Sequence, residues 1–207
     1  MSERPQPPTA RPPGRPRRED NRGRDVLAAA VELFASRGFD ATSIRDIAAA
    51  AQVQPASVYY HYPSKEALLV AIVDRAAAQV AAQITAAAQA PDPWLRLEQA
   101  CVAHLTALLH GEGALRVLAT EIPSRRTGAV QQALVRTRDA YEDMFRELVA
   151  ALPVRPDVDR SYLRLTLLGA INWTLIWYRP GADSPATIAH HIVTLIRQGA
   201  EGSQKIP

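Results

Sequence analysis

Apolar residues recur along most of the chain at the three- and four-residue spacing of amphipathic helices. No segment alternates apolar and polar residues at the two-residue spacing of a strand, so the pattern predicts an all-α protein. The first helix is expected from Arg24 to Arg37, with Gly38 ending it and Phe39 folding back onto it as a core residue. Further helices are expected between breaks that contain proline or glycine: 65–90, 94–110, 114–122, 128–152, 157–178 and 184–199.

Two short helices joined by a tight turn are predicted between residues 41 and 65. Thr42 or Ser43 can cap the first helix, the turn falls at residues 51–53, and Pro55 suits the first position of the second helix. That second helix, about 55–60, is too short and too polar to be a core helix. A polar helix that follows a helix and a turn is the arrangement that enters the DNA major groove. The pattern therefore predicts a helix-turn-helix at about 43–62.

Residues 26–69 carry a resemblance that extends this prediction. The first helix with Phe34 and Gly38-Phe39, then ATSIRDIAAAA, then VYYHYPSKEALL, resembles the TetR family of bacterial transcriptional regulators. The resemblance implies a DNA-binding domain at 24–70 and a C-terminal ligand-binding and dimerisation domain at 71–207. About nine helices are expected in all. The family resemblance further implies a homodimer whose two DNA-binding domains occupy successive major grooves of a double-stranded DNA operator.

The resemblance also implies which residues meet DNA. Phosphate contacts are expected from Thr42, Ser43, Tyr60, His61 and Lys65. Base-edge contacts are expected from Arg45, Gln54, Pro55, Ala56, Ser57 and Tyr59. Two alternatives stay open, since the Tyr59 ring can pack in the core of the head and His61 can cap the helix end. The turn position at which the family usually has glycine is Gln52, where a left-handed conformation costs on the order of 1 kcal/mol.

The stretch GAINWTLIWYRPGADS, at 169–184, gathers aromatic and polar side chains near one helix end. Trp173 and Trp177 share a helix face and could line a pocket for a flat or apolar ligand, with Arg179 meeting an anion. The alternative is an aromatic lock in a dimer interface. The NWT…WYRPG pattern resembles TetR-type regulators of lipid and sterol degradation that respond to acyl-CoA thioesters, which implies a small-molecule effector of that class. The candidate ligand residues are Arg116, Tyr141, Phe145, Asn172, Trp173, Trp177 and Arg179.

Two apolar stripes on the last two helices fit either a monomer core or a four-helix dimer interface. The first stripe consists of Leu163, Leu167, Ala170, Ile171, Thr174 and Leu175. The second consists of Ile188, Ile192, Leu195 and Ile196.

Net charge is +3, and its distribution matters more than its size. Residues 1–24 hold seven arginines against three acidic residues, giving +4 and leaving −1 for the rest. Residues 1–23 are rich in proline without apolar periodicity, so a disordered basic tail is expected. The tail is either a DNA-binding arm or a solvated leader. No apolar run suits a membrane span or a signal peptide, and a single cysteine suits a cytoplasmic protein.

Catalytic signatures are missing from the sequence. It has no glycine-rich phosphate loop, no Ser/His/Asp grouping and no paired carboxylates at meaningful spacing. His190 and His191 point about 100° apart on a helix, which does not suit a shared metal. We therefore expect no enzyme and no cofactor. The competing hypotheses are a sequence-independent architectural DNA-binding protein and a TetR-type regulator of efflux that responds to hydrophobic drugs.

Overall fold

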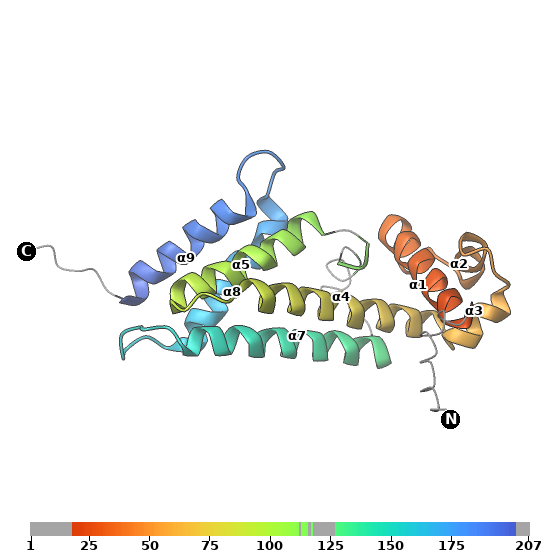
Figure 1. Cartoon of the computed structure of the whole chain (residues 1–207), viewed down its shortest axis with the longest axis horizontal. Coiled ribbons are helices and arrows are strands. Elements are labelled where there is room, and N and C mark those ends of the chain that lie inside the picture. The colour runs from red at the N-terminus through yellow and green to blue at the C-terminus, as the bar shows by residue number, and fades with distance from the viewer. Residues whose placement is uncertain (1–17, 112, 116, 118–126, 202–207) are drawn as a thin grey trace, which may run out of the picture.

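The computed structural model describes residues 18–111, 113–115, 117 and 127–201. Within this part of the chain it has eight α-helices and no strand, which confirms the all-α prediction. Most of the helix expected at 114–122 lies outside the described residues. A head formed by the first three helices stands at one end of the molecule, and the long helix α4 runs from it into a helical body (Figure 1).

The head consists of α1 (Arg18–Arg37), α2 (Ile44–Ala50) and α3 (Pro55–His61). The predicted start of α1 at Arg24 was wrong by six residues, because the added turns carry no apolar stripe that a pattern could detect. Its end was predicted correctly. Gly38 has φ +84°, a left-handed conformation that suits glycine after a helix, and the Phe39 ring packs 5.2 Å from the Phe34 ring.

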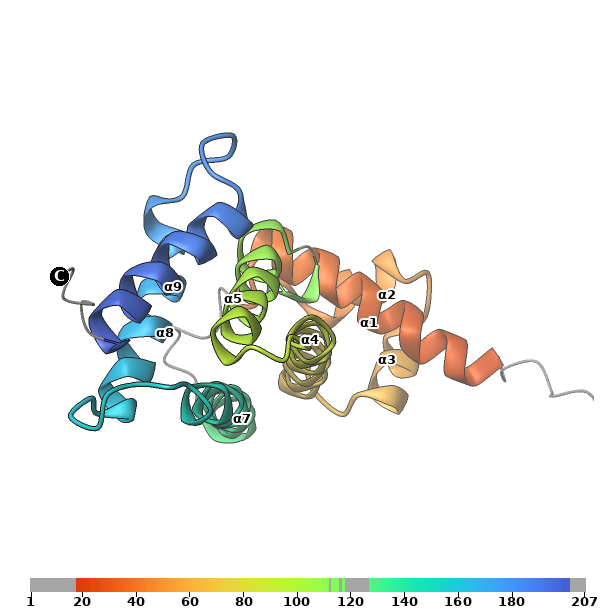
Figure 2. The same cartoon turned by 60° about the vertical axis from the view of Figure 1, so that its left-hand side comes forward.

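The body surrounds α4 (Lys65–Ala87), which packs against α5 (Pro93–His110) and α7 (Gly128–Ala150). The helices α8 (Arg160–Trp177) and α9 (Pro185–Glu201) complete it, with α9 lying on α5 and α8 (Figure 2). By length and composition α4 also passes for a membrane span. In the fold α1, α5 and α7 pack against α4, and a single helix of this kind is weak evidence for a membrane span.

Side chains explain where two helices depart from their predicted bounds. The helix α4 ends three residues before the expected residue 90. There the Gln99 Oε1 accepts the Gln89 and Ala90 amides at 3.2 and 3.1 Å, and the backbone leaves the helix. The helix α8 begins at Arg160 rather than 157, because the Asp159 carboxylate caps it by accepting two backbone amides.

Two hydrophobic clusters fill the molecule. The first joins the head to the beginning of α4 and also takes in Leu115, Val117, Val130 and Leu134, which belong to the body by sequence. The second lies among α5, α7, α8 and α9. A boundary at residue 70 therefore divides the chain but not the hydrophobic core, and the N-terminal half of α7 packs with the head.

Candidate functional site

The start of α2 is fixed by a reciprocal pair of hydrogen bonds. The Ser43 hydroxyl accepts the Asp46 amide at 3.2 Å, while the Asp46 carboxylate accepts the Ser43 amide at 2.8 Å and the Ser43 hydroxyl at 2.6 Å. These bonds lower the pKa of Asp46, since they favour its charged form. Of the two predicted caps, Ser43 is the one used.

The turn between α2 and α3 contains the only non-glycine residue with positive φ in the described part of the chain, Gln52 at 55°. Its amide donates to the Ala49 carbonyl at 3.2 Å, and the Val53 amide donates to the Ala48 carbonyl at 2.9 Å. This pair of bonds is the Schellman motif, which usually ends in glycine. The expected left-handed conformation at Gln52 is confirmed.

The helix α3 presents most of its surface to solvent, and Val58 is its buried residue. Tyr59 is 52% exposed and Tyr60 76% exposed, which favours an outward Tyr59 over one packed in the core of the head. Arg45 is exposed on the neighbouring helix α2. We call the following set the recognition surface: Arg45, Gln54, Pro55, Ala56, Ser57, Tyr59 and Tyr60, all exposed or partly exposed.

Two residues predicted to contact phosphates also form hydrogen bonds within the head. The Thr42 side chain is buried, and its hydroxyl donates to the Gly38 carbonyl at 2.8 Å. The Lys65 ammonium donates to the Phe39 and Thr42 carbonyls, both at 2.9 Å, and lies 4.2 Å from the centroid of the Phe39 ring. Both side chains hold the loop between α1 and α2, so they support the recognition surface from behind.

His61 lies between the recognition surface and α1. A Cβ on Gly23 of α1 would lie 3.2 Å from its Nδ1, and its ring meets the Tyr60 ring edge-on at 5.1 Å. The helix α3 ends through the Tyr62 amide, which donates to the Val58 carbonyl, so His61 does not act as the cap. The Tyr62 hydroxyl donates to the Gly23 carbonyl at 3.4 Å, and burial raises the pKa of Tyr62.

A polar cluster centred on the buried His104 lies in the body. His104 of α5 places Nε2 3.1 Å from Asn172 Oδ1 and Nδ1 3.1 Å from the Tyr141 hydroxyl. Because the Asn172 oxygen can only accept, Nε2 carries the proton and Nδ1 accepts from Tyr141 in this orientation of the amide. Burial lowers the pKa of His104 to about 4, so the ring is neutral at neutral pH.

The predicted ligand residues fall into two groups. Tyr141, Phe145 and Asn172 come together around His104, with the Tyr141 and Phe145 rings 4.9 Å apart. Trp173 and Trp177 are 63% and 47% exposed on α8, and the exposed Arg179 follows them. The side chain of Arg116 lies outside the described residues. Sequence reasoning missed His104, although its place on the apolar face of α5, three residues after Cys101, was a usable signal.

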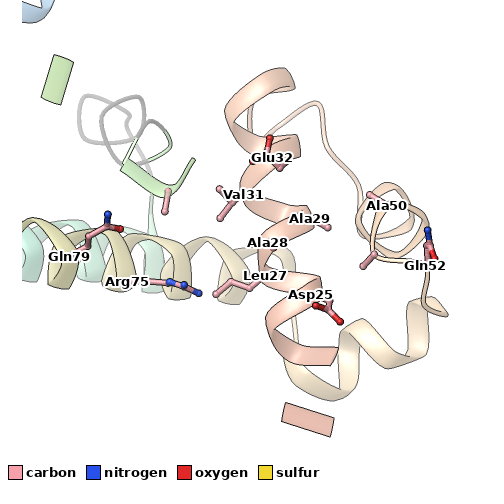
Figure 3. Close-up of a pocket in the computed structure, with 12 residues that line it drawn as sticks. Asp25, Leu27, Ala28, Ala29, Val31, Glu32, Ala50, Gln52, Arg75 and Gln79 are labelled. Carbon is pink, nitrogen blue, oxygen red and sulfur yellow. The ribbon is translucent and has the colours of Figure 1, made fainter. Parts of the chain in front are cut away.

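Two hollows lie elsewhere. One of about 560 Å³ lies between the head and α4, where Leu27, Val31, Gln52, Arg75 and Gln79 are among its lining residues (Figure 3). The other, of about 490 Å³, lies between α4 and α5. Its polar lining residues are Gln79, Gln83, Thr106 and His110. Gln79 therefore lines both hollows, and none of the predicted ligand residues that the structure describes lines either.

Comparison with known families decides the identity of this architecture. Residues 26–72 match the family model described as bacterial regulatory proteins, tetR family. Residues 90–200, more than half of the chain, match the model described as the tetracyclin repressor-like C-terminal domain. The chain belongs to the TetR family.

Several TetR relatives resemble it over most of their length. The HTH-type transcriptional repressor KstR2 of Mycolicibacterium smegmatis is 26% identical over 200 residues, covering 93% of this chain and 97% of the relative. KstR2 of Mycobacterium tuberculosis H37Rv is 27% identical, covering 81% and 86%. The crystal structure of AibR in complex with isovaleryl coenzyme A and operator DNA superposes with a TM-score of 0.71 at 23% identity, covering 84% of this chain and 97% of AibR.

Membership of the TetR family confirms the predicted class of function. TetR regulators are helix-turn-helix proteins that bind operator DNA as homodimers, and the matched family consists of transcriptional regulators rather than enzymes. Within the described residues, no cluster of three His, Cys, Asp or Glu side chains could hold a metal ion.

One surface of this TetR regulator is unusually apolar. The exposed large apolar residues of the body lie mainly on α8 and α9: Tyr162, Leu165, Trp173, Leu175, Ile176, Trp177 and Leu195. We call this set the α8 face. Four members of the first predicted stripe, Leu163, Leu167, Ile171 and Thr174, are buried in the body, whereas Ala170 is partly buried and Leu175 is exposed. The same helix is therefore apolar on two sides. Exposure of both tryptophans favours the dimer-interface alternative over a ligand pocket.

Proposed function

We propose that this TetR regulator is a cytoplasmic repressor that an acyl-CoA thioester releases from a palindromic operator. The observation that carries the DNA-binding half is the recognition surface, a short exposed helix held by a capped partner helix and a tight turn. The acyl-CoA half is supported by the NWT…WYRPG resemblance and by the likeness to AibR, whose crystal structure contains isovaleryl coenzyme A.

The recognition surface suits the major groove. Arg45 can donate two hydrogen bonds to one guanine, while Pro55 and Ala56 offer apolar contact of the kind that a thymine methyl accepts. Gln54, Ser57 and Tyr59 add groups that can hydrogen-bond base edges. The Ser43, Tyr60 and His61 side chains, at the ends of α2 and α3, are placed for phosphates, which position a protein on DNA without reading sequence. Lys65 keeps one ammonium hydrogen beyond the two that bind carbonyls.

The α8 face is the surface that we assign to the second copy. Large apolar side chains that gather on an exposed surface mark a protein–protein contact in soluble proteins. Pairing of α8 and α9 across a two-fold axis would cover Trp173, Trp177 and Leu195. Two heads then meet two half-sites, which explains why a palindromic operator is expected.

The hollow between α4 and α5 is our candidate for the effector. Its volume of about 490 Å³ lies within the range of small-molecule sites, and Gln83, Thr106 and His110 provide polar groups beside apolar walls. The His110 Nε2 lies 3.1 Å from the Tyr178 hydroxyl, which ties this hollow to the end of α8. The cluster of His104, Tyr141 and Asn172 joins α5, α7 and α8 and does not line this hollow.

Release of DNA would follow from a shift between two head positions. An effector that prefers one position lowers DNA affinity only as far as its affinities for the two positions differ. The helix α4 is the connection, because its residue Gln79 lines both the effector hollow and the hollow beside the head (Figure 3).

A panel of ligands tests the effector class. The full-length protein is bound to a labelled duplex that it has enriched from a randomised pool. Isovaleryl-CoA, octanoyl-CoA and a steroid-derived acyl-CoA are then added, beside the free acids and hydrophobic drugs. The proposal expects release by at least one thioester and not by its free acid. Release by drugs alone would instead favour the efflux-regulator hypothesis. His110→Ala should weaken the response to the thioester while leaving DNA affinity unchanged.

A further inference from the structure

We propose that Arg22 and Arg24 form a phosphate-binding site outside the helix-turn-helix, held beside the DNA by the contact of Gly23 with His61. The inference rests on the proposed function, because it presupposes that α3 lies on DNA. Neither arginine belongs to the recognition surface, and both lie on α1.

The first turns of α1 are docked onto the C-terminal end of α3. Gly23 approaches His61 so closely that a Cβ would lie 3.2 Å from its Nδ1. The Gly23 carbonyl accepts the hydroxyl of Tyr62, whose ring packs against the core of the head. Figure 2 shows this end of α1 projecting past α2 and α3 at the end of the molecule that carries the recognition surface. The position of residues 22–24 relative to α3 is therefore set by two independent contacts.

The docking of α1 onto α3 also sets where Arg22 and Arg24 lie. Both are exposed, and at about 100° per residue they project from either side of the edge on which Gly23 meets His61. Asp25, which follows Arg24 in the sequence, lines the hollow between α1, α2 and α4 (Figure 3). Each guanidinium carries five N–H donors and stays charged, the chemistry that binds a phosphate diester.

A glycine inside a helix is unfavourable relative to alanine, so its presence at position 23 calls for a physical reason. The close approach to His61 supplies one. A larger side chain would have to move the imidazole by a few tenths of an ångström, and with it the ring of Tyr60 that meets its edge. Gly23 thus positions both the two arginines and the exposed end of α3.

Salt dependence distinguishes phosphate contacts from other effects. The full-length wild type and Arg22→Ala/Arg24→Ala are titrated onto the enriched duplex and a scrambled duplex of equal length, between about 50 and 200 mM salt. Each lost phosphate contact lowers the slope of log K against log salt by about 0.9, so a homodimer that loses four contacts changes by about 3.6. Affinity should fall by a similar factor on both duplexes, leaving the preference for the enriched one intact.

The control removes two arginines from the body. Arg138→Ala/Arg146→Ala on α7 makes the same change in net charge at side chains that are 62% and 58% exposed. It should leave the slope of the wild type unchanged. An unchanged slope for the Arg22/Arg24 variant, or an equal drop in the control, overturns this inference alone. Failure of the wild type to enrich any duplex, or to prefer it over the scrambled one, overturns the proposed function instead.

Discussion

The ammonium group of Lys65 lies 2.9 Å from the carbonyl oxygen of Phe39 and 4.2 Å from the centroid of its ring. A residue that sequence similarity places at a DNA phosphate thus also closes the loop between α1 and α2. Hydrogen bonds from a charged donor contribute about 1.5–3 kcal/mol when they are shielded from water, and Lys65 is only partly buried.

We therefore expect Lys65→Ala to lower the free energy of unfolding by about 2 kcal/mol. Arg45→Ala is the matched variant, because it removes an exposed cation from the same head. It should change stability by less than about 0.5 kcal/mol yet weaken DNA binding. Urea unfolding and DNA titration of both variants check this pair of outcomes. Equal stability of Lys65→Ala and wild type would show that the two carbonyl contacts do not hold the loop.

A glycine at the left-handed position of the turn between α2 and α3 should stabilise the protein. Gln52 adopts φ 55°, so Gln52→Gly removes the strain of a left-handed residue and should raise the free energy of unfolding by about 1 kcal/mol. Ala51→Gly, one residue earlier at φ −80°, relieves no strain and should lower stability by up to about 1 kcal/mol. Thermal unfolding of the two variants gives the comparison. A loss of stability on Gln52→Gly would contradict the Schellman assignment.

His104 should make the body sensitive to acid. Its pKa is about 4 in the fold, against 6.5 for the unperturbed group, so the unfolded chain binds the proton more readily. Its contribution to stability is complete above pH 6.5 and is lost as pH falls towards 4, by about 3 kcal/mol.

The matched variant is His104→Gln, which has no group that titrates in this range. Unfolding by urea at pH 7 and pH 4.5 should show a larger loss for the wild type than for the variant. The same loss in both proteins would assign the acid sensitivity to other groups.

The α8 face should set the oligomeric state. Trp173→Glu/Ile176→Glu places two charges among exposed apolar residues and should yield a monomer in sedimentation experiments, because a charge buried without a partner opposes association. Leu95→Glu is the control, since Leu95 is 48% exposed on α5 and does not belong to the α8 face. It should remain a dimer. A dimeric Trp173→Glu/Ile176→Glu variant would place the interface elsewhere.

The sequence predicted the elements better than it predicted the direction of side chains. Gly38, Ser43 and Pro55 mark helix ends through local chemistry, and the structure confirms each at its helix end. The Thr42 side chain faces inward because its hydroxyl donates to the Gly38 carbonyl, which lies near it only in the folded loop. No local pattern carries that information.

The same distinction holds in the body. The sequence predicted an apolar stripe on α8. It did not predict that a second side of the same helix is also apolar and is exposed to solvent. His104, Tyr141 and Asn172 come from three different helices. Tyr141 is 37 residues and Asn172 is 68 residues from His104 in the sequence, and only the fold brings them together. The spacing of these residues along the chain does not indicate the cluster. A polar residue on an otherwise apolar helix face, as His104 is, does indicate a polar contact inside the fold.

The most direct test of the account is a comparison of two duplexes. Full-length protein is titrated at about 150 mM salt onto the duplex that it enriches from a randomised pool, and onto a scrambled duplex of the same length and composition. A sequence-reading repressor should bind the enriched duplex at least about 10³-fold more tightly, in two half-sites per dimer. Equal affinity for both would contradict the account and indicate an architectural DNA-binding protein.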